Sequence, residues 1–530
     1  SYLMLLWALI ISVALTYSIL SIPSPSRILR WTCSSPTINF IRSSKRATIT
    51  DDLLAESTIS KDVANLIFVG LKTNNAYSLP SLELDDIIIS RLDGNRTNSC
   101  FKCSIKNTLL SFFVKYATNQ TGRFGDNELN RERLSFEYEG MKAFATYTPE
   151  LVPTVFSYDS QNSLILSEYL YHYRPIQLLF ERGDIPADVS RYIATLMGRN
   201  HGRTHRSAVS PAKKQRYMDA FHNENHFNLW RSHLGGLLDD LSTLTPSTTD
   251  SSLHQIHAAI EYNKTPMDIL KQLNSDRNQL FTRSITALQQ IFLTKKETLI
   301  HGELDSTNIL FRQKEDDSDP REGAASLLLK AVDFENCRYG PAGLDLGLFL
   351  SCFMSYYVAH ALPAPRRNLL SQVAAAIDAY KVAFRIQFSS TWKKDSARTT
   401  VTLASSTVIV PEAEVELNEI LIDAVGFAAL YLLLVALELP LSKPQPLDGV
   451  AVCDWGDRLG RQRSVHRRMV HLAGQLFDLF QQHHDCNDKN LLSDVEQQGY
   501  VAVMSVEKIL NAVRTDDTLL LTDHYTEFWS

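Results

Sequence analysis

The chain has 530 residues, which is too long for one ordinary hydrophobic core and favours two lobes with extensions. Apolar residues make up 44% and charged residues 21%, a balance typical of folded soluble proteins and not of disordered ones. With 53 basic and 59 acidic residues the formal net charge is −6, so no basic excess is available to bind a nucleic-acid backbone, and nucleic acid is excluded as a partner.

The first 26 residues have the pattern of a membrane anchor or a targeting segment. No charge precedes Arg27, and Tyr2 to Ile22 is apolar and long enough to span a bilayer as a hydrophobic helix. A cleaved signal or organelle-targeting peptide is the main alternative. Basic residues follow in a Ser/Pro-rich linker over residues 27–50. The positive-inside tendency therefore predicts a membrane-anchored protein whose folded part faces the cytosol; otherwise the chain is organelle-targeted.

Residues 51–172 predict a small β-rich N-terminal lobe. Helical patterning over Asp51 to Leu79 is followed by short β-branched and aromatic runs separated by turn signals, among them IIISRLDG, SCFKCSI and LLSFFVKYA. Apolar residues at helical spacing predict a helix over Glu128 to Phe144, and SLILSEYL predicts a strand over Ser163 to Leu170.

Cysteine usage gives no support to a disulfide framework, since seven cysteines are spread over a long chain. The close pair Cys100 and Cys103 has a spacing that can hold zinc or perform redox chemistry. However, positions three apart in a strand face opposite sides of the sheet. No second pair completes a site, so we predict no metal there.

Residues 173–482 predict a large helical C-terminal lobe. Two apolar stretches, Leu346 to Pro365 and Ala424 to Leu437, resemble membrane spans, but the first contains Gly347, His360 and prolines and the second is too short. We expect both to be buried helices. Polar surface insertions are predicted at Thr243–Ser252, Lys314–Ala325 and Ser389–Ser406, and residues 483–530 form a helical C-terminal extension.

The densest chemical signal is the run His301-Gly302-Glu303-Leu304-Asp305-Ser306-Thr307-Asn308, followed after an apolar strand by Asp333-Phe334-Glu335. Phosphoryl transfer from ATP needs one carboxylate to take or orient the acceptor hydroxyl, and a carboxamide and a second carboxylate to hold Mg²⁺ against the phosphates. Glu303, Asn308 and Asp333 stand in that order and spacing.

HGELDSTNIL and VDFENCRYGPAGLDLG resemble the catalytic and metal-binding segments of the methylthioribose kinase family, within the aminoglycoside phosphotransferase and choline kinase-like group. FLTKKETLIHGEL, LILSEYL and the order of elements in the N-terminal lobe resemble that family too. The resemblance covers about residues 50–480. It implies an α+β, two-lobed protein-kinase-like fold with ATP and Mg²⁺ as cofactors.

The resemblance also implies roles for single residues, each at the position that matches the family's motif. Catalysis falls to Glu303 and Asn308, and the metal ligands are Asn308, Asp333 and Glu335. His301 and Asp345 support the catalytic loop. The residues expected to contact the nucleotide are Asp93, Gly94 and Asn95 in the phosphate loop, Lys115, its partner Glu137 (Glu139 being the alternative), and the hinge around Glu168 and Leu170.

The chain departs from the family pattern at two places. Glu303 stands where the family has Asp, and the extra methylene moves the carboxylate outward by about 1.5 Å. Ile422 and Asp423 stand where the family has two arginines of the substrate pocket, so the methylthioribose pose is not expected to be kept.

These observations predict an ATP-dependent kinase that phosphorylates a hydroxyl of a small, sugar-like acceptor. The alternative is a catalytically silent kinase-fold subunit, structural or regulatory, of a membrane-associated assembly. Glu303 and the altered pocket favour the silent subunit, whereas the intact set of Lys115, Asn308 and Asp333 favours the enzyme. A homodimer or a place in a membrane complex is compatible with both readings.

Overall fold

The computed structural model describes residues 65–66, 68–69, 83–92, 98–117, 130–183, 185–242, 265–277, 279–313, 327–360, 362–395, 410–437, 458–488, 508–511 and 513. All of them belong to one unit, Ile59–Ser530. The predicted anchor over residues 1–26, the linker over 27–50 and the phosphate-loop residues Asp93, Gly94 and Asn95 lie outside the described residues. Membrane attachment and the phosphate loop therefore stay predictions.

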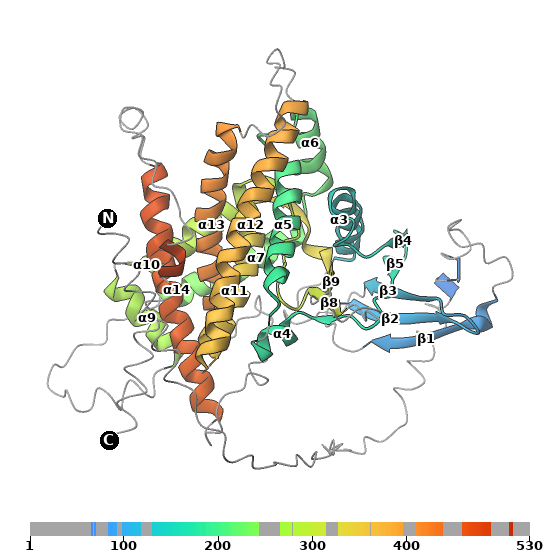
Figure 1. The fold of residues 1–530 in the computed structure, drawn as a ribbon, viewed down its shortest axis with the longest axis horizontal. Coiled ribbons are helices and arrows are strands. Elements are labelled where there is room, and N and C mark those ends of the chain that lie inside the picture. The colour runs from blue at the N-terminus through green and yellow to red at the C-terminus, as the bar shows by residue number, and fades with distance from the viewer. Residues whose placement is uncertain are drawn as a thin grey trace, which may run out of the picture. The chain divides into compact units, whose positions relative to one another are not determined.

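An antiparallel five-stranded sheet forms the N-terminal part (Figure 1). Its strand order is β1-β2-β3-β5-β4. The short helix η1 (Leu84–Asp86) precedes it, and the strands are β1 (Ile87–Leu92), β2 (Asn98–Ile105), β3 (Ser111–Ala117), β4 (Val155–Asp159) and β5 (Leu164–Glu168). The β5 strand lies within the segment predicted from SLILSEYL.

The two faces of this sheet have different neighbours. Phe101 and Cys103 of β2 pack with Phe112 of β3 in an apolar cluster on one face. On the other face Cys100 is paired with Lys115, its cross-strand neighbour. Cys100 and Cys103 thus face opposite sides, as their spacing predicts, and burial raises the pKa of each thiol to about 12, so neither is a ready thiolate ligand.

One helix, α3 (Arg133–Tyr147), connects β3 with β4 in the chain order. It begins five residues later than the predicted start at Glu128 and ends three residues later than Phe144. At its start the Asn130 side-chain oxygen accepts the backbone N–H of Glu132 at 2.9 Å. Such a local turn competes with helical hydrogen bonding and delays the first helical turn.

The rest of the described chain is largely helical, which confirms the predicted order of a β-rich part followed by a helical part. The helices are α4 (Gln177–Arg182), α5 (Ala187–Thr204), α6 (Pro211–Ala220), α7 (Glu224–Ser242), α9 (Pro266–Asp276), α10 (Leu280–Thr294), α11 (Ala342–Ala359), α12 (Pro363–Asp395), α13 (Pro411–Ala436) and α14 (Arg458–Asp488). The last of these continues past residue 482, the predicted end of the helical lobe.

Two small sheets position the segments around Glu303 and Asp333 within this helical part. The strands β7 (Thr298–Ile300) and β10 (Arg338–Gly340) pair with each other. A second sheet joins β6 (Arg174–Pro175), β8 (Ile309–Gln313) and β9 (Leu327–Ala331). The loop over residues 301–308 therefore leaves β7 and enters β8, and the 3-10 turn η2 (Phe334–Asn336) follows β9.

The helices α11 and α13 lie side by side and form the centre of the helical part (Figure 1). Among the described residues, these two helices are long and apolar enough to cross a membrane, yet both are almost wholly buried, in agreement with the expected buried helices. The first apolar stretch is interrupted at His360, where α11 ends and whose ring contacts the Phe180 carbonyl at 2.8 Å.

Close approach of α11 to α13 depends on two glycines. A Cβ at Gly343 would lie 2.5 Å from the Cβ of Asp423, and one at Gly347 would lie 2.6 Å from the carbonyl oxygen of Ala424. The backbone of Ala424 cannot yield without moving the helix, so this spacing has no room for a side chain.

Gly347→Ala is expected to lower the free energy of unfolding by about 1–3 kcal/mol, since overpacking outweighs the gain in helix propensity. Gly236→Ala is the matched control, because Gly236 also lies within a helix but its Cβ would meet nothing within 4 Å. The control is expected to raise the free energy of unfolding by about 0.5–1 kcal/mol. Equal effects in chemical denaturation would contradict the close helix contact.

Candidate active site

Lys115 is the centre of the candidate site. Its Nζ lies 2.6 Å from Glu137 Oε2 on α3 and 2.5 Å from Asp333 Oδ1, which directly precedes η2. The lysine side chain is only 3% exposed. Burial lowers its pKa, but Asp333 and Glu137 raise it by more, so the pKa of Lys115 lies well above its ordinary value and the ammonium stays charged.

Asp333 reaches this position through an unusual backbone conformation. Its φ of 69° and ψ of 54° are in the left-handed region, which a non-glycine residue seldom adopts. The following Phe334 is fully buried and packs against Phe144 of α3 and the ring of His301. The buried phenyl ring holds the turn in place, and the strained residue directs its carboxylate toward Lys115.

Asp345, in the first turn of α11, braces the catalytic loop. Its two carboxylate oxygens accept the backbone N–H groups of His301 at 2.7 Å and Gly302 at 2.8 Å. The His301 ring in turn contacts the Val332 carbonyl at 3.1 Å. The structure therefore gives His301 and Asp345 supporting contacts of the kind expected from the sequence.

Inside the loop, two residues fix the backbone. Asp305, which the sequence reading did not single out, accepts the N–H groups of Thr307 at 2.8 Å and Asn308 at 3.1 Å. The Asn308 side chain donates to the Glu303 carbonyl at 2.9 Å. An Asp followed by Ser-Thr-Asn is a known turn-forming pattern, so this role was readable in principle.

The Glu303 carboxylate is held by a residue of the neighbouring turn. Asn336 Nδ2 donates a hydrogen bond to Glu303 Oε2 at 2.8 Å. The two segments approach closely because Gly302 has a φ of +85°, and a Cβ there would lie 2.3 Å from the Asn336 carbonyl oxygen. Asn336 was not predicted as a site residue; its contact depends on the tertiary approach of two segments.

Glu335 points toward the N-terminal sheet. Its Oε2 accepts a hydrogen bond from Asn98 Nδ2 at 2.7 Å and lies 3.5 Å from Arg133 Nε. Neither Asn98 nor Arg133 was predicted from the sequence. At the predicted hinge, both the N–H and the carboxylate of Glu168 bond to Thr154, at 2.8 and 3.0 Å. Leu170 follows directly after, and its carbonyl accepts the N–H of Tyr173 at 3.4 Å.

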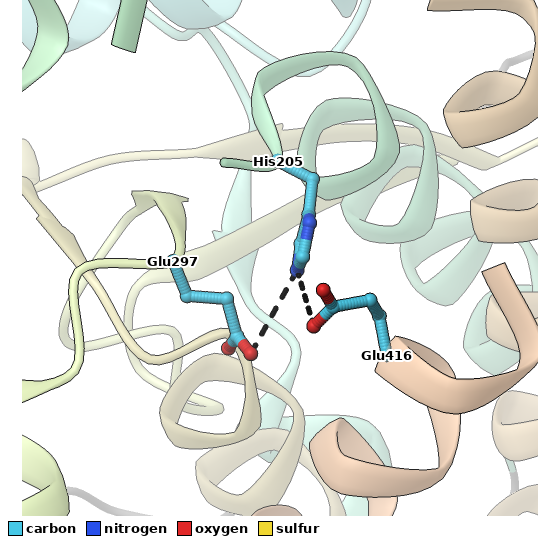
Figure 2. A group of neighbouring side chains, drawn as sticks. All are labelled: His205, Glu297 and Glu416. Atoms are coloured by element: carbon cyan, nitrogen blue, oxygen red, sulfur yellow. Dashed lines mark ion pairs between the residues drawn. The ribbon is translucent and has the colours of Figure 1, made fainter. Parts of the chain in front are cut away.

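A second group of converging side chains, His205, Glu297 and Glu416, has a composition that can hold a metal ion (Figure 2). His205 Nε2 lies 3.7 Å from one oxygen of each glutamate. However, the ring Nδ1 accepts the backbone N–H of Ser207 at 3.3 Å, so the ring proton lies on Nε2 and faces the carboxylates. A metal ion bound to Nε2 would require the ring proton to be on Nδ1, where it would point at the backbone N–H of Ser207. We therefore interpret this group as a polar network in which the ring N–H of His205 faces two carboxylates.

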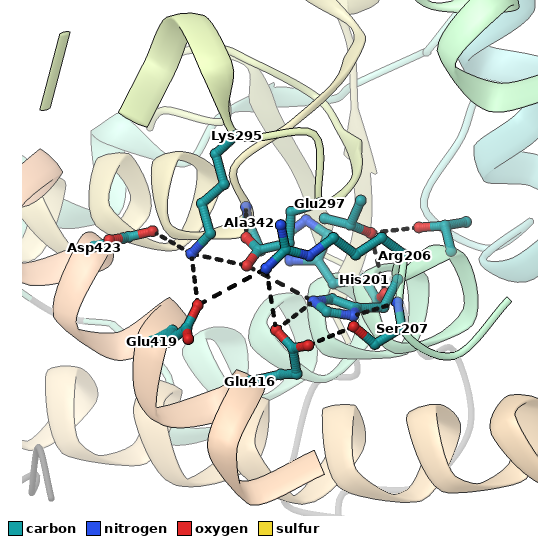
Figure 3. A network of polar contacts seen from close by, with 12 residues as sticks. His201, Arg206, Ser207, Lys295, Glu297, Ala342, Glu416, Glu419 and Asp423 are labelled. Atoms are coloured by element: carbon teal, nitrogen blue, oxygen red, sulfur yellow. Dashed lines mark hydrogen bonds and ion pairs between the residues drawn. The ribbon is translucent and has the colours of Figure 1, made fainter. Parts of the chain in front are cut away.

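The wider network includes Lys295, which contacts three acidic side chains (Figure 3). Its Nζ lies 2.8 Å from Asp423 and 2.9 Å from Glu297. Glu297 also accepts the N–H of Ala342 at 2.7 Å and so caps the start of α11. Asp423, which the resemblance places where the family has an arginine, thus has a cationic partner within the chain.

Comparison with known proteins first gives a protein family and a solved structure to which the chain is similar. Residues 207–361 match the ecdysteroid kinase-like family. A solved choline kinase from Cryptosporidium parvum aligns with 82% of this chain and 97% of its own, at 13% identity and a TM-score of 0.38.

The particular relatives are methylthioribose kinases. That of Geobacillus thermodenitrificans is 25% identical over 382 residues, 71% of this chain and 83% of the relative. That of Bacillus pumilus is 23% identical over 362 residues, 67% of this chain and 80% of the relative. These matches confirm the predicted resemblance: over most of its length the chain is a distant relative of methylthioribose kinases.

Lys295→Met is expected to lower the free energy of unfolding by about 3–5 kcal/mol, because it leaves buried carboxylates without their cation. Lys142→Met is the matched control, since Lys142 pairs with Glu139 on the exposed face of α3. An exposed pair contributes less than about 1 kcal/mol. Urea denaturation measures both, and a small loss at Lys295 would argue that the buried carboxylates are protonated or otherwise compensated.

Proposed function

We propose that this chain is an ATP-dependent kinase that transfers a phosphoryl group to a hydroxyl of a small, sugar-like molecule. The observation that supports this most directly is the buried Lys115, whose ammonium pairs with Glu137 on one side and Asp333 on the other. A lysine paired with a helix glutamate, next to an aspartate that can hold a metal, is the arrangement that kinase folds use around ATP phosphates.

The residues present fit a magnesium–nucleotide complex. Carboxylate oxygens of Glu137, Asp333 and Glu335 lie within 4.8 Å of one another, and oxygen ligands are those that Mg²⁺ prefers. Glu137 is engaged by Lys115, and Glu335 by Asn98. Asp333 also contacts Lys115, but this contact can pass to the phosphates, so Asp333 and Asn308 are the residues that would hold the metal. When bound, Mg·ATP supplies the phosphoryl group and offsets the negative charge at the site.

The chain's own groups then have separate tasks. Lys115 would exchange its contact with Asp333 for a contact with phosphate oxygens, which leaves Asp333 available for the metal. Glu303 would accept the proton of the acceptor hydroxyl or orient that hydroxyl for attack. Asn308, bonded to the Glu303 carbonyl, keeps the loop in the conformation that brings these groups together.

The length of Glu303 is accommodated by Asn336. A carboxylate displaced by about 1 Å from its required position can lose on the order of a hundredfold in rate. Here the longer side chain is tethered by the Asn336 amide at 2.8 Å, which limits the positions that the carboxylate takes. This tether supports a working glutamate over a misplaced one.

The acceptor is expected to differ from methylthioribose. Asp423 stands in place of an arginine and forms an ion pair with Lys295, so neither charge remains available to a substrate at that position. We propose a sugar-like acceptor because the relatives are kinases named for a ribose derivative.

Mg·ATP is expected to raise the melting temperature of the protein, and Asp333→Ala is expected to remove that shift, because the principal metal carboxylate is lost. At a ligand concentration of a hundred times Kd, the shift corresponds to about 2.7 kcal/mol. Glu139→Ala, on the exposed face of α3, is the control that should keep the full shift. A wild-type protein that shows no shift with Mg·ATP would refute the nucleotide site.

Glu303→Asp separates a working enzyme from a catalytically silent subunit. In a working enzyme the shorter side chain loses the Asn336 contact, and kcat is expected to fall by on the order of a hundredfold with little change in ATP affinity. In a chain whose activity has faded, the aspartate found in the relatives would raise turnover. ADP release with a panel of sugars shows whether Glu303→Asp lowers or raises turnover. Glu303→Gln keeps the length of the side chain and controls for loss of the base. Normal Mg·ATP binding without turnover in any form would favour the silent subunit.

A further inference from the structure

Glu335 belongs to η2 (Phe334–Asn336), which we call the metal turn because it follows Asp333, the residue proposed to hold the metal. The groups that face Glu335 come from the N-terminal part of the chain. Its Oε2 accepts the amide of Asn98 at 2.7 Å, and it lies 3.5 Å from Arg133 Nε and 3.7 Å from Lys115 Nζ. These three residues belong to β2, α3 and β3 respectively. The side chain of Glu335 is 11% exposed and that of Arg133 is 6% exposed, so water contributes little to their solvation.

Asn98 and Arg133 are themselves joined. Arg133 Nη2 donates to Asn98 Oδ1 at 2.8 Å, while Nη1 donates to the Asn130 carbonyl at 2.9 Å. Glu335, Asn98 and Arg133 thus form a closed triangle of polar contacts between η2, β2 and α3. A buried guanidinium is costly unless an anion lies beside it, and Glu335 provides that anion.

The contacts with Asn98 and Arg133 both use Glu335 Oε2. Metal ligation through Oε2 would take the acceptor from the Asn98 amide and the anion from beside the buried Arg133 guanidinium. The cost of an unpaired buried charge is far larger than that of an exposed one. The geometry therefore gives Oε2 of Glu335 a positioning task, separate from the metal role that the resemblance implies for this residue.

We infer that Glu335 is a positioning residue that ties the metal turn to α3 and β2 through Arg133 and Asn98. Arg133 and Glu137 lie four residues apart on the same face of α3. One of them contacts the turn after Asp333, and the other contacts Lys115. The two contacts together fix the position of α3 relative to the residue proposed to hold the metal.

The test compares Glu335→Gln, Arg133→Met and the double variant by thermal unfolding and by Mn²⁺ binding in the presence of a non-hydrolysable ATP analogue, followed by electron paramagnetic resonance. The Mn²⁺-binding measurement rests on the proposed function, whereas thermal unfolding does not. If Glu335 and Arg133 act as a tie, each single variant lowers the melting temperature, and the double variant lowers it no further than the more damaging single one. Mn²⁺ affinity then falls by the same factor in both single variants.

The opposite pattern would overturn the inference. A metal-ligand Glu335 predicts that Glu335→Gln weakens Mn²⁺ binding by more than about tenfold while Arg133→Met leaves it unchanged. Additive losses of melting temperature would also overturn it. If the wild-type protein binds no Mn·nucleotide, the proposed function is wrong. The melting temperatures of the variants still test whether Glu335 and Arg133 tie the turn to α3.

Three further variants protect the test against misfolding and non-specific effects. Arg133→Lys keeps the charge but not the paired donors that reach both Asn98 and Asn130, and is expected to recover part of the melting temperature. On the exposed face of α3, Glu139→Gln and Lys142→Met remove a pair of the same charge type, 3.4 Å apart, and should leave both readouts unchanged.

Discussion

The ammonium group of Lys115 joins the two parts of the chain on which the site depends. It is anchored to β3, and its two short contacts reach α3 and the turn after β9. Three carboxylates and one more cation, Arg133, surround it, so the charges are nearly balanced only when α3, the sheet and the metal turn are together. These charges are buried, so moving α3, the sheet and the turn apart would leave a charge with neither an ionic partner nor water around it, which is energetically costly. The same requirement would make the site responsive to the proposed Mg·ATP, whose phosphates and metal ion would take over these charge contacts.

A second cluster of paired charges, which includes Glu297 and Lys295, supports the strand β7 and the start of α11. Glu297 precedes β7 and caps α11, while Asp345, one turn into α11, accepts two backbone N–H groups after β7. The short strand β7 is thus held to the start of α11 at both ends by carboxylates, which are favourable at a helix N-terminus. Through Lys295 and Asp423 this support extends to α13. The catalytic loop has a fixed starting direction because α11 and α13 are packed without space at Gly343 and Gly347.

The sequence predicts most of the elements and brings attention to the motif residues around Lys115 and Asp333, but not to the residues that connect them. Lys115, Glu303, Asn308 and Asp333 follow a spacing that chemistry dictates, and the strands and buried helices follow from apolar periodicity. Asn98, Arg133 and Asn336 have no such signal. Their partners lie 237, 202 and 33 positions away, and a polar residue near a helix start or in a turn is usually explained by local structure. The start of α3 was misplaced for a related reason, since the turn at Asn130 depends on one side chain.

The position of Glu303 shows why a departure from a family motif does not by itself indicate loss of function. An aspartate in this loop is placed by the backbone alone, whereas a glutamate has one more rotatable bond and needs a partner to restrict it. Asn336 provides that partner from a segment already fixed by Phe334 and by the contact with Gly302. A chain in which the glutamate had no task would have no physical reason to keep a donor 2.8 Å from its carboxylate. The structure thus ties the Glu303 carboxylate, proposed to act on the acceptor, to the same turn that presents Asp333, the residue proposed to hold the metal.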